Sequence, residues 1–262
     1  MLLAVDVGNT NTVFAVFDQS GMIRGEWRSS TSAERTADEI GVWLNQVMTL
    51  AGIKASDIDA AIIATVVPAV LFNLRFMCRR YFACQPLVIG APEVNLGLHV
   101  VVDRPEEVGA DRLVNAVAAF ALYGGPLVVV DFGTATTFDV IDGEGSYLGG
   151  AIAPGINLSL KALHDASAQL PRVAVGRPDR VIGKGTVQAM RSGVFWGYVS
   201  LVEGMVRRIG EEYGTSLDAI ATGGLASLFT ECTPVLKHAD PDLTLKGLFA
   251  IHERNREPTG RS

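Results

Sequence analysis

Residues 6–12 read DVGNTNT and lie between two short apolar runs, 1–5 and 13–17. This pattern predicts a strand, a tight polar turn, and a second strand antiparallel to the first. Gly8 allows the backbone to turn closely and to approach a ligand, because glycine has no Cβ. The chain is therefore expected to begin with a β-hairpin whose turn is polar and has small side chains.

The turn also carries groups that suit a phosphate. Asparagine and threonine add side-chain donors to the backbone N–H groups, and a concave set of donors favours an anion. Asp6 ends the first strand, where its carboxylate could hold a hydrated cation on that phosphate. An ordinary hairpin turn has the same composition, so this stretch alone leaves both interpretations open.

A second copy of the pattern lies near the middle of the chain. Residues 127–137 read LVVVDFGTATT, and each copy continues through a second strand to a glycine turn, at Gly21 and at Gly145. Such a repeat indicates a duplicated domain rather than a solenoid. Two phosphate-type hairpins facing each other across a cleft resemble the actin, hexokinase and acetate-kinase superfamily of nucleotide-binding proteins. The resemblance implies a duplicated actin/hexokinase-like α/β fold, with two β-β-β-α-β-α-β domains.

Composition indicates a protein with a large core. The chain has 262 residues, of which 48% are apolar and 19% charged, so two ordinary domains fit and disorder is disfavoured. The net charge of −6 argues against a nucleic-acid partner. No apolar run approaches about 20 residues, so no membrane span is expected. The cysteines lack metal-binding spacing, which favours free thiols and a cytoplasmic protein; they are Cys78, Cys84 and Cys232.

The remaining segments complete the two expected domains. The patterns predict helices at 37–51, 69–82, 113–122, 156–167, 186–213 and 243–252, and strands at 59–67, 86–89, 98–102 and 217–221. Gly124-Gly125-Pro126 is the expected boundary between domains 1–123 and 124–262. Residues 170–185 are expected to form a surface loop, and residues 238–242 a second loop.

Three glycines on the long predicted helix, at positions 193, 197 and 204, share one flank. Without side chains there, another backbone can approach closely. That backbone could belong to a second copy of the chain or to another helix of the same subunit, and the sequence favours neither.

Residues 109–112 read GADR and lead into the apolar-faced helix predicted at 113–122. Asp111 could take a proton from an alcohol as a general base. Arg112 could pair with a carboxylate through two hydrogen bonds, and the helix N-terminus adds its positive end. An acidic residue at a helix start beside a solvated arginine is also common, so this motif alone favours a structural role.

Three motifs in this order, DVGNTN at 6–11, GADR at 109–112 and DFGTATT at 131–137, resemble those of the type III pantothenate kinases. GGAIAPG at 149–155 and TGG at 222–224 also match, so the resemblance extends to about the final helix. It implies ATP-dependent transfer of a phosphoryl group to the primary hydroxyl of pantothenate, the first committed step toward coenzyme A, with Mg2+ on the ATP.

The resemblance also implies roles for individual residues. Asp111 is expected to be the general base, Arg112 to bind the pantothenate carboxylate, and Asp131 to bind K+ or NH4+. Further contacts are implied to ATP from Asp6, Val7, Gly8, Asn9, Thr10, Asn11, Thr12, Val13 and Thr134, and to pantothenate from Gly109, Ala110, Asp111, Arg112 and Thr186. The family is typically a homodimer, which the sequence allows.

Two features depart from familiar patterns. No lysine follows either glycine turn, so the chain has no Walker-type phosphate loop. Val102 stands where many members of the family carry tyrosine; Arg112 and Thr186 could hold the substrate without that tyrosine, and the alternative is an altered pantothenate contact. The alternatives are a kinase of the same superfamily acting on another small acid or sugar, and a nucleotide-binding regulator without turnover. GADR disfavours the first, and the presence of Asp6, Asp111 and Asp131 disfavours the second.

Overall fold

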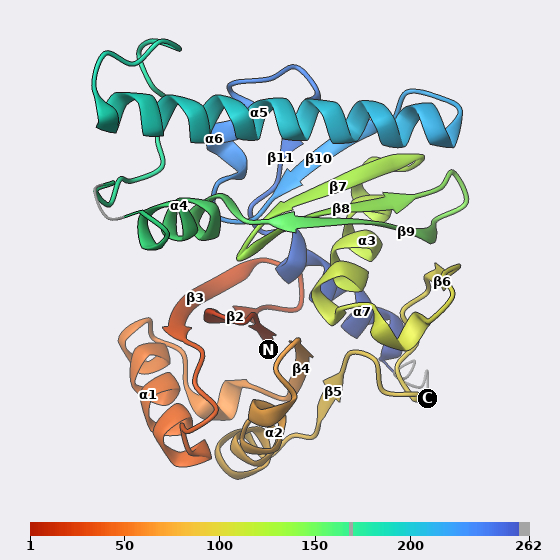
Figure 1. Ribbon diagram of the computed structural model, residues 1–262. Helices are drawn as coiled ribbons and strands as arrows, with labels where there is room; N and C mark the ends of the chain where they lie inside the picture. Colours follow the sequence, from red (N-terminus) through yellow and green to blue (C-terminus); the bar gives the residue numbers. More distant parts are fainter. Residues whose placement is uncertain (168–169, 257–262) are drawn as a thin grey trace. The chain divides into compact units, whose positions relative to one another are not determined.

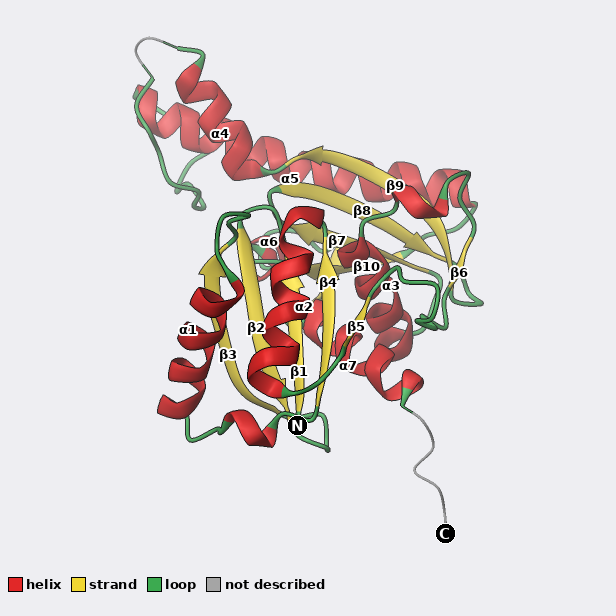
Figure 2. Cartoon of the chain, turned by 90° about the horizontal axis from the view of Figure 1, so that it is seen from below, coloured by secondary structure: helices red, strands yellow, loops and turns green. Residues whose placement is uncertain are grey.

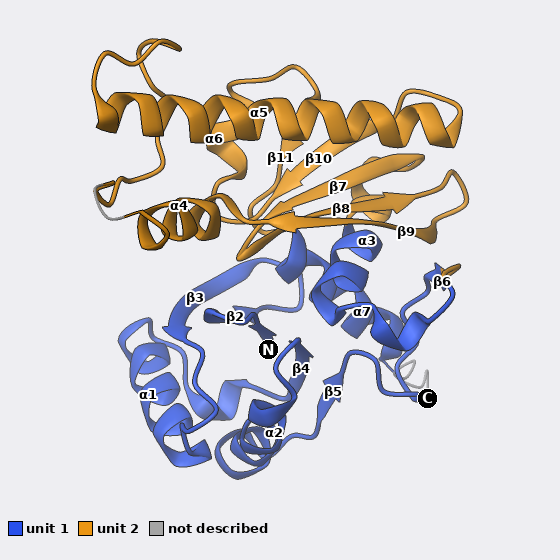
Figure 3. Ribbon diagram, in the orientation of Figure 1, with its two compact units in different colours: residues 1–99, 103–118, 243–262 blue, residues 100–102, 119–242 orange. Residues whose placement is uncertain are grey.

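The computed structural model describes residues 1–167 and 170–256, and the chain divides into two compact units (Figure 3). Unit 1 comprises residues 1–99, 103–118 and the segment from 243 onward, whereas unit 2 comprises residues 100–102 and 119–242. This division differs from the predicted domains 1–123 and 124–262. It falls inside helix α3 (Ala110–Tyr123), and the final helix belongs to the first unit.

Unit 1 is built on a five-stranded sheet with the order β3-β2-β1-β4-β5. Its strands are β1 (Leu2–Val7), β2 (Asn11–Phe17), β3 (Ile23–Ser30), β4 (Ala60–Thr65) and β5 (Pro86–Val88). β1, β2 and β3 pair antiparallel, while β4 is parallel to β1 and β5 is parallel to β4. The carboxyl ends of β1 and β4 therefore lie at one edge of the sheet.

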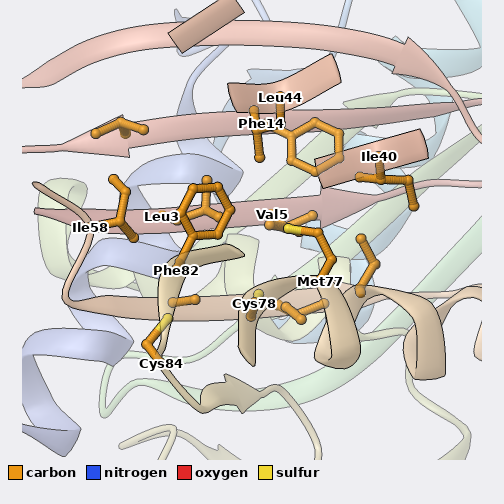
Figure 4. Close-up of a cluster of buried hydrophobic side chains, with 14 of the residues drawn as sticks. Leu3, Val5, Phe14, Ile40, Leu44, Ile58, Met77, Cys78, Phe82 and Cys84 are labelled. Atoms are coloured by element: carbon orange, nitrogen blue, oxygen red, sulfur yellow. The ribbon is translucent and has the colours of Figure 1, made fainter. Parts of the chain in front are cut away.

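Helices cover both faces of this sheet (Figures 1 and 2). They are α1 (Ala37–Leu50), α2 (Pro68–Phe82), the first part of α3, and α7 (Leu243–Asn255), with short 3-10 helices η1 (Ala55–Asp57) and η2 (Pro105–Glu107). Alternate residues of β1 face opposite sides. Leu3 and Val5 join the core under α1 and α2 (Figure 4), and Leu2 and Ala4 join the core under α3 and α7. Burial on both faces explains the nearly uniform apolar sequence of β1 and β4.

The three cysteines are free thiols, as predicted. Cys78 and Cys84 lie in the core under α1 and α2 (Figure 4), and Cys232 is partly buried. Burial raises the pKa of Cys78 to about 12. This thiol is therefore protonated near neutral pH and acts as an apolar core side chain.

Helix α7 packs closely on α3 because Gly247 has no side chain. A Cβ at this position would lie 2.3 Å from the carbonyl oxygen of Val114 in α3, which is closer than real Cβ contacts. We expect Gly247→Ala to lower the free energy of unfolding by about 1–3 kcal/mol, the usual cost of overpacking a core. Urea unfolding followed by circular dichroism measures this difference.

The matched control for this variant is Gly143→Ala. A Cβ there would make only an ordinary contact, 3.9 Å from Cδ of Pro126, so its stability should stay within about 0.5 kcal/mol of the parent. Equal stability of the Gly247→Ala variant and the parent would contradict the close packing of α7 on α3.

Unit 2 repeats the strand order of unit 1. Its sheet has the order β11-β10-β7-β8-β9-β6, so β9-β8-β7-β10-β11 corresponds to β3-β2-β1-β4-β5. The strands are β6 (His99–Val100), β7 (Leu127–Phe132), β8 (Ala135–Ile141), β9 (Ser146–Pro154), β10 (Asp218–Thr222) and β11 (Leu236–Ala239). The pairings also correspond, antiparallel from β7 to β9 and parallel from β7 to β11. The predicted duplication is confirmed.

The helices of unit 2 are α4 (Ile156–Asp165), α5 (Thr186–Tyr213) and α6 (Ala226–Thr230), which share one core with the sheet (Figure 1). Residues 170–185 contain no helix or strand, in agreement with the predicted loop. The prediction of a loop at 238–242 was wrong for its first two residues, because β11 extends to Ala239. Within the described part of the chain, no helix is long and apolar enough to cross a membrane.

Candidate active site

The first hairpin forms as predicted. Val7 and Thr12 are the last paired residues of β1 and β2, so residues 8–11 make the turn. A hydrogen bond from the first N–H of this turn to its last carbonyl oxygen (3.0 Å) closes it. Residues 9–11 are exposed, whereas Asp6 is half-buried near the end of β1. The turn therefore presents its donors at the carboxyl edge of the sheet.

Thr31, which directly follows β3, holds this turn from behind. Its N–H donates to the carbonyl oxygen of Thr10 (2.9 Å), and its hydroxyl donates to the carbonyl oxygen of Gly8 (2.8 Å). The hydroxyl of Thr12 lies 2.9 Å from that of Thr31 and must be the donor, because a hydroxyl has one hydrogen. The Thr12 side chain is thus buried behind the turn, and only its backbone remains for a ligand. Sequence reasoning did not identify Thr31.

The GADR segment lies at the same edge of unit 1. A Cβ at Gly109 would lie 3.5 Å from Cγ1 of Val66, and the N–H of Val66 donates to the carbonyl oxygen of Val7 (3.1 Å). Val66 closely follows β4, and Val7 ends β1. The start of α3 therefore lies beside the carboxyl ends of the parallel strands β1 and β4, which is the usual ligand edge of such sheets.

The local geometry explains the order of residues in GADR. Asp111 lies in the first turn of α3, and its Oδ1 accepts a hydrogen bond from the N–H of Arg112 (2.8 Å). A Cβ at Gly109 would lie 2.6 Å from that same oxygen, so a side chain there would displace the Asp111 carboxylate from this position. Asp111 and Arg112 are both half-buried. A carboxylate and a guanidinium thus share one helical turn at the edge of the sheet where β1 and β4 end.

The second hairpin has the same plan with a tighter turn. Phe132 and Thr136 are the last pair of β7 and β8, so residues 133–135 form the turn, and Gly133 N–H donates to the carbonyl oxygen of the third turn residue (3.0 Å). Thr134 is exposed at the tip. The N–H of Gly155 donates to the carbonyl oxygen of Thr134 (3.1 Å). In the first hairpin, the N–H of Thr31 donates to the carbonyl oxygen of Thr10 in the same way.

Asp131 lies beside the TGG segment in unit 2. Its partner across the parallel β7–β10 pair is Thr222, the last residue of β10. A Cβ on the next residue, Gly223, would lie 2.5 Å from Oδ1 of Asp131 and 2.8 Å from the carbonyl oxygen of Phe132. Gly223 also has φ +85°, which disfavours a side chain. The backbone of Gly223 therefore packs closely against a carboxylate oxygen and a carbonyl oxygen.

Two further positions singled out from the sequence lie in unit 2. Thr186 is the exposed first residue of α5, after Gly185 as its N-cap. Val102 is half-buried after β6, and its Cγ1 lies 3.6 Å from the point where a Cβ of Gly149 would be. Asp131, Thr134 and Thr186 are thus described within unit 2, and the residues of the first hairpin and GADR within unit 1.

Two sheets of one strand order, each with an Asp-x-Gly hairpin at the carboxyl ends of its central strands, define an α/β protein of the actin and hexokinase fold class. An ethanolamine utilization protein of Carboxydothermus hydrogenoformans has a similar structure, with a TM-score of 0.57, 18% identity, and coverage of 94% of this chain and 88% of that one. The activator of 2-hydroxyisocaproyl-CoA dehydratase from Clostridium difficile, solved with bound ADPNP, gives a TM-score of 0.57 at 11% identity over 100% and 99% of the two chains. At such low identity these likenesses show the fold alone.

Sequence comparison identifies the family. The family model described as type III pantothenate kinase matches residues 2–208. A protein of Paramagnetospirillum magneticum with that name is 64% identical over 258 residues, which cover 98% of this chain and 99% of the relative. One from Rhodospirillum rubrum is 64% identical over 256 residues, covering 98% and 99%. The chain belongs to the type III pantothenate kinase family.

Proposed function

We propose that the protein transfers the γ-phosphoryl group of ATP to the primary hydroxyl of pantothenate, giving 4'-phosphopantothenate in the first step of coenzyme A biosynthesis. The observation that carries this proposal is the GADR segment at the start of α3, beside the first hairpin at the carboxyl edge of β1 and β4. A base and an anion clamp next to a phosphate turn suit transfer to a hydroxy acid. The name shared by the relatives supports the same acceptor.

The first hairpin is proposed to bind the ATP phosphates. Residues 6–13 supply this contact through the backbone of the turn and the exposed side chains at 9–11, while the Thr12 hydroxyl stays behind the turn. Thr134, exposed at the tip of the second hairpin, adds a further nucleotide contact. Neither turn carries a lysine, so backbone donors and bound cations must neutralise the phosphate charge.

The start of α3 is proposed to bind and activate pantothenate. Arg112 pairs with the pantothenate carboxylate, Gly109 and Ala110 allow the substrate to approach the backbone, and Thr186 adds a contact from α5. Asp111 accepts the proton of the attacking hydroxyl as phosphoryl transfer proceeds. Aligning the alcohol with the γ-phosphoryl group is the main task, because this reaction needs little covalent chemistry from the protein.

The oxygen atoms beside Gly223 fit a monovalent cation. Carboxylate and carbonyl oxygens are the ligands that hard cations and K+ prefer. Oδ1 of Asp131 and the carbonyl oxygen of Phe132 both lie within 2.8 Å of the point that a Cβ would fill. We propose that Asp131 binds K+ or NH4+ close to this point, with the carbonyl oxygen of Phe132 as a second ligand. The ion, when bound, supplies positive charge toward the phosphates.

Magnesium is proposed to arrive with ATP. In the part of the chain that the structure describes, no three His, Cys, Asp or Glu side chains are grouped to hold a metal ion. Mg2+ commonly keeps several waters and binds through one or two carboxylates together with substrate phosphates. Asp6 at the end of β1 is the carboxylate placed for that role in unit 1.

Arg112→Ala tests the clamp on the carboxylate. We expect KM for pantothenate to rise by on the order of 10-fold or more, since a hydrogen bond to a charged group contributes about 1.5–3 kcal/mol. KM for ATP should stay near that of the parent. Arg104→Ala is the control. Arg104 is exposed, and within the described part of the chain its ion pair is with the exposed Glu107. A variant in which only the ATP requirement changed would show that Arg112 does not bind pantothenate.

The reaction is tested by ADP release from MgATP in potassium buffer, with and without pantothenate. We expect release that depends on pantothenate and falls when sodium replaces potassium. A panel of other hydroxy acids and sugars distinguishes a kinase for another acceptor. ATP binding without release for any acceptor would favour the regulator interpretation instead.

We also propose a homodimer that works in the cytoplasm, where its substrates ATP and pantothenate meet. A Cβ at Gly193, Gly197 or Gly204 would meet no heavy atom within 4 Å, so no other described backbone uses this flank of α5. The flank is thus open to a second copy of the chain. Sedimentation should give twice the 27.8 kDa of one chain, and Gly197→Glu should give the mass of a monomer. A monomeric parent protein would contradict the proposal.

A further inference from the structure

The second hairpin lacks one support that the first hairpin has. In unit 1, Thr31 holds the turn with two groups, its backbone N–H on Thr10 and its hydroxyl between Gly8 and Thr12. In unit 2, Gly155 makes the corresponding backbone bond to Thr134 but has no side chain. A Cβ on Gly155 would lie 2.3 Å from the carbonyl oxygen of Thr134, so no hydroxyl can come from this position.

A tyrosine on another element supplies the missing hydroxyl. Tyr198 of α5 is buried, and its hydroxyl donates a hydrogen bond to the carbonyl oxygen of Pro154. The hydroxyl of Thr136 lies 3.1 Å away. Because the phenol has only one hydrogen, Thr136 is the donor in this second bond. Thr136 corresponds to Thr12, since each is the first paired residue after its turn.

The tyrosine reaches the tip of the turn through one peptide group. The carbonyl of Pro154 and the N–H of Gly155 belong to the same peptide unit, which accepts from Tyr198 on one side and donates to Thr134 on the other. Hydrogen bonds in such a chain polarise and strengthen one another. Tyr198 therefore holds the Thr134 backbone through this peptide group, and the base of the turn through its direct hydrogen bond with Thr136.

We propose that Tyr198 is a positioning residue for nucleotide binding, holding the second hairpin in the conformation that presents Thr134 to ATP. This inference rests on the proposed role of that hairpin as a phosphate site. Burial raises the pKa of Tyr198, so the phenol keeps its proton near neutral pH. The ring packs against Phe229, with centroids 5.9 Å apart, and this contact is independent of the hydroxyl.

Tyr198→Phe removes the hydroxyl and keeps the ring. We expect KM for ATP, and Kd for ATP by calorimetry without acceptor, to rise about 3- to 10-fold, the usual effect of one lost hydrogen bond. KM for pantothenate should change little, while the thermal midpoint should fall by a few degrees, because the buried Thr136 hydroxyl loses its acceptor. Tyr213→Phe on the same helix is the matched control, because the Tyr213 hydroxyl makes no hydrogen bond with the residues that the structure describes. That variant should bind ATP like the parent.

A double-mutant cycle with Thr136→Val separates positioning from general loss of stability. If the hydroxyls of Tyr198 and Thr136 act through one hydrogen-bond chain, the double variant should bind ATP no more weakly than Tyr198→Phe alone. An unchanged Kd for ATP in Tyr198→Phe would overturn the proposal. Additive losses of ATP affinity in the cycle would also overturn it, and so would equal losses of affinity for ATP and for pantothenate. A parent protein that binds ATP but does not phosphorylate pantothenate would contradict the proposed reaction, while the series of ATP Kd values would still decide the role of Tyr198.

Discussion

Replacing Asp111 by asparagine is expected to lower kcat by on the order of 100-fold or more, the usual loss when a general base is removed. The asparagine side chain can still accept the N–H of Arg112 through its carbonyl oxygen, so the first turn of α3 should persist. ATP affinity should stay near that of the parent, because only the proton acceptor is lost. Steady-state kinetics with saturating substrates, together with ATP calorimetry, measure both quantities.

Asp218→Asn is the control for this variant. Asp218 is exposed at the start of β10, at the amino end of that strand, so its loss should leave turnover unchanged. Near-normal turnover of Asp111→Asn would remove Asp111 from the role of base. Loss of ATP binding together with turnover would instead place this carboxylate among the nucleotide contacts.

Gly223→Ala is expected to have the second large effect. The added Cβ would lie 2.5 Å from Oδ1 of Asp131 and 2.8 Å from the carbonyl oxygen of Phe132, on a backbone with φ +85°. The proposed cation ligands must move to make room, and a displacement of about 1 Å in such a site can cost on the order of 100-fold in rate. We therefore expect a loss of this size in kcat and a higher K+ concentration for half-maximal activity.

Gly224→Ala provides the comparison for the potassium titration. A Cβ on this neighbouring residue would meet no heavy atom within 4 Å, so the dependence of activity on K+ should match that of the parent. Thermal unfolding of both variants shows whether the fold persists. A folded Gly223→Ala protein with an unchanged response to K+ would show that the ion binds elsewhere.

The repeated hairpins could be predicted from sequence because their signals are local. β1 and β7 are central strands, buried on both faces, so each appears as an apolar run that ends in Asp-x-Gly. The edge strand β11 gave no such signal. Of its residues only Leu236 is buried, and a strand paired on one side can remain polar. The sequence pattern at the end of β11 therefore predicts a loop.

The supports of the hairpins could not be predicted, because they depend on contacts across the fold. Thr31 lies 19 residues from Thr12, and Tyr198 lies 62 residues from Thr136. A threonine in a polar stretch and a tyrosine on an apolar helix are both common. No sequence spacing therefore distinguishes Thr31 or Tyr198 as a support of a hairpin. The packing of α7 in unit 1 could not be predicted for the same reason, since it depends on the contact of Gly247 with α3.

The identity of the product tests the central claim most directly. The protein is incubated with MgATP, K+ and pantothenate, and the mixture is analysed by mass spectrometry and phosphorus NMR. We expect pantothenate with one phosphoryl group on its primary hydroxyl, formed in an amount equal to the ADP released. Pantothenate recovered unmodified, while ATP is bound or hydrolysed, would contradict the assignment of this chain as a pantothenate kinase.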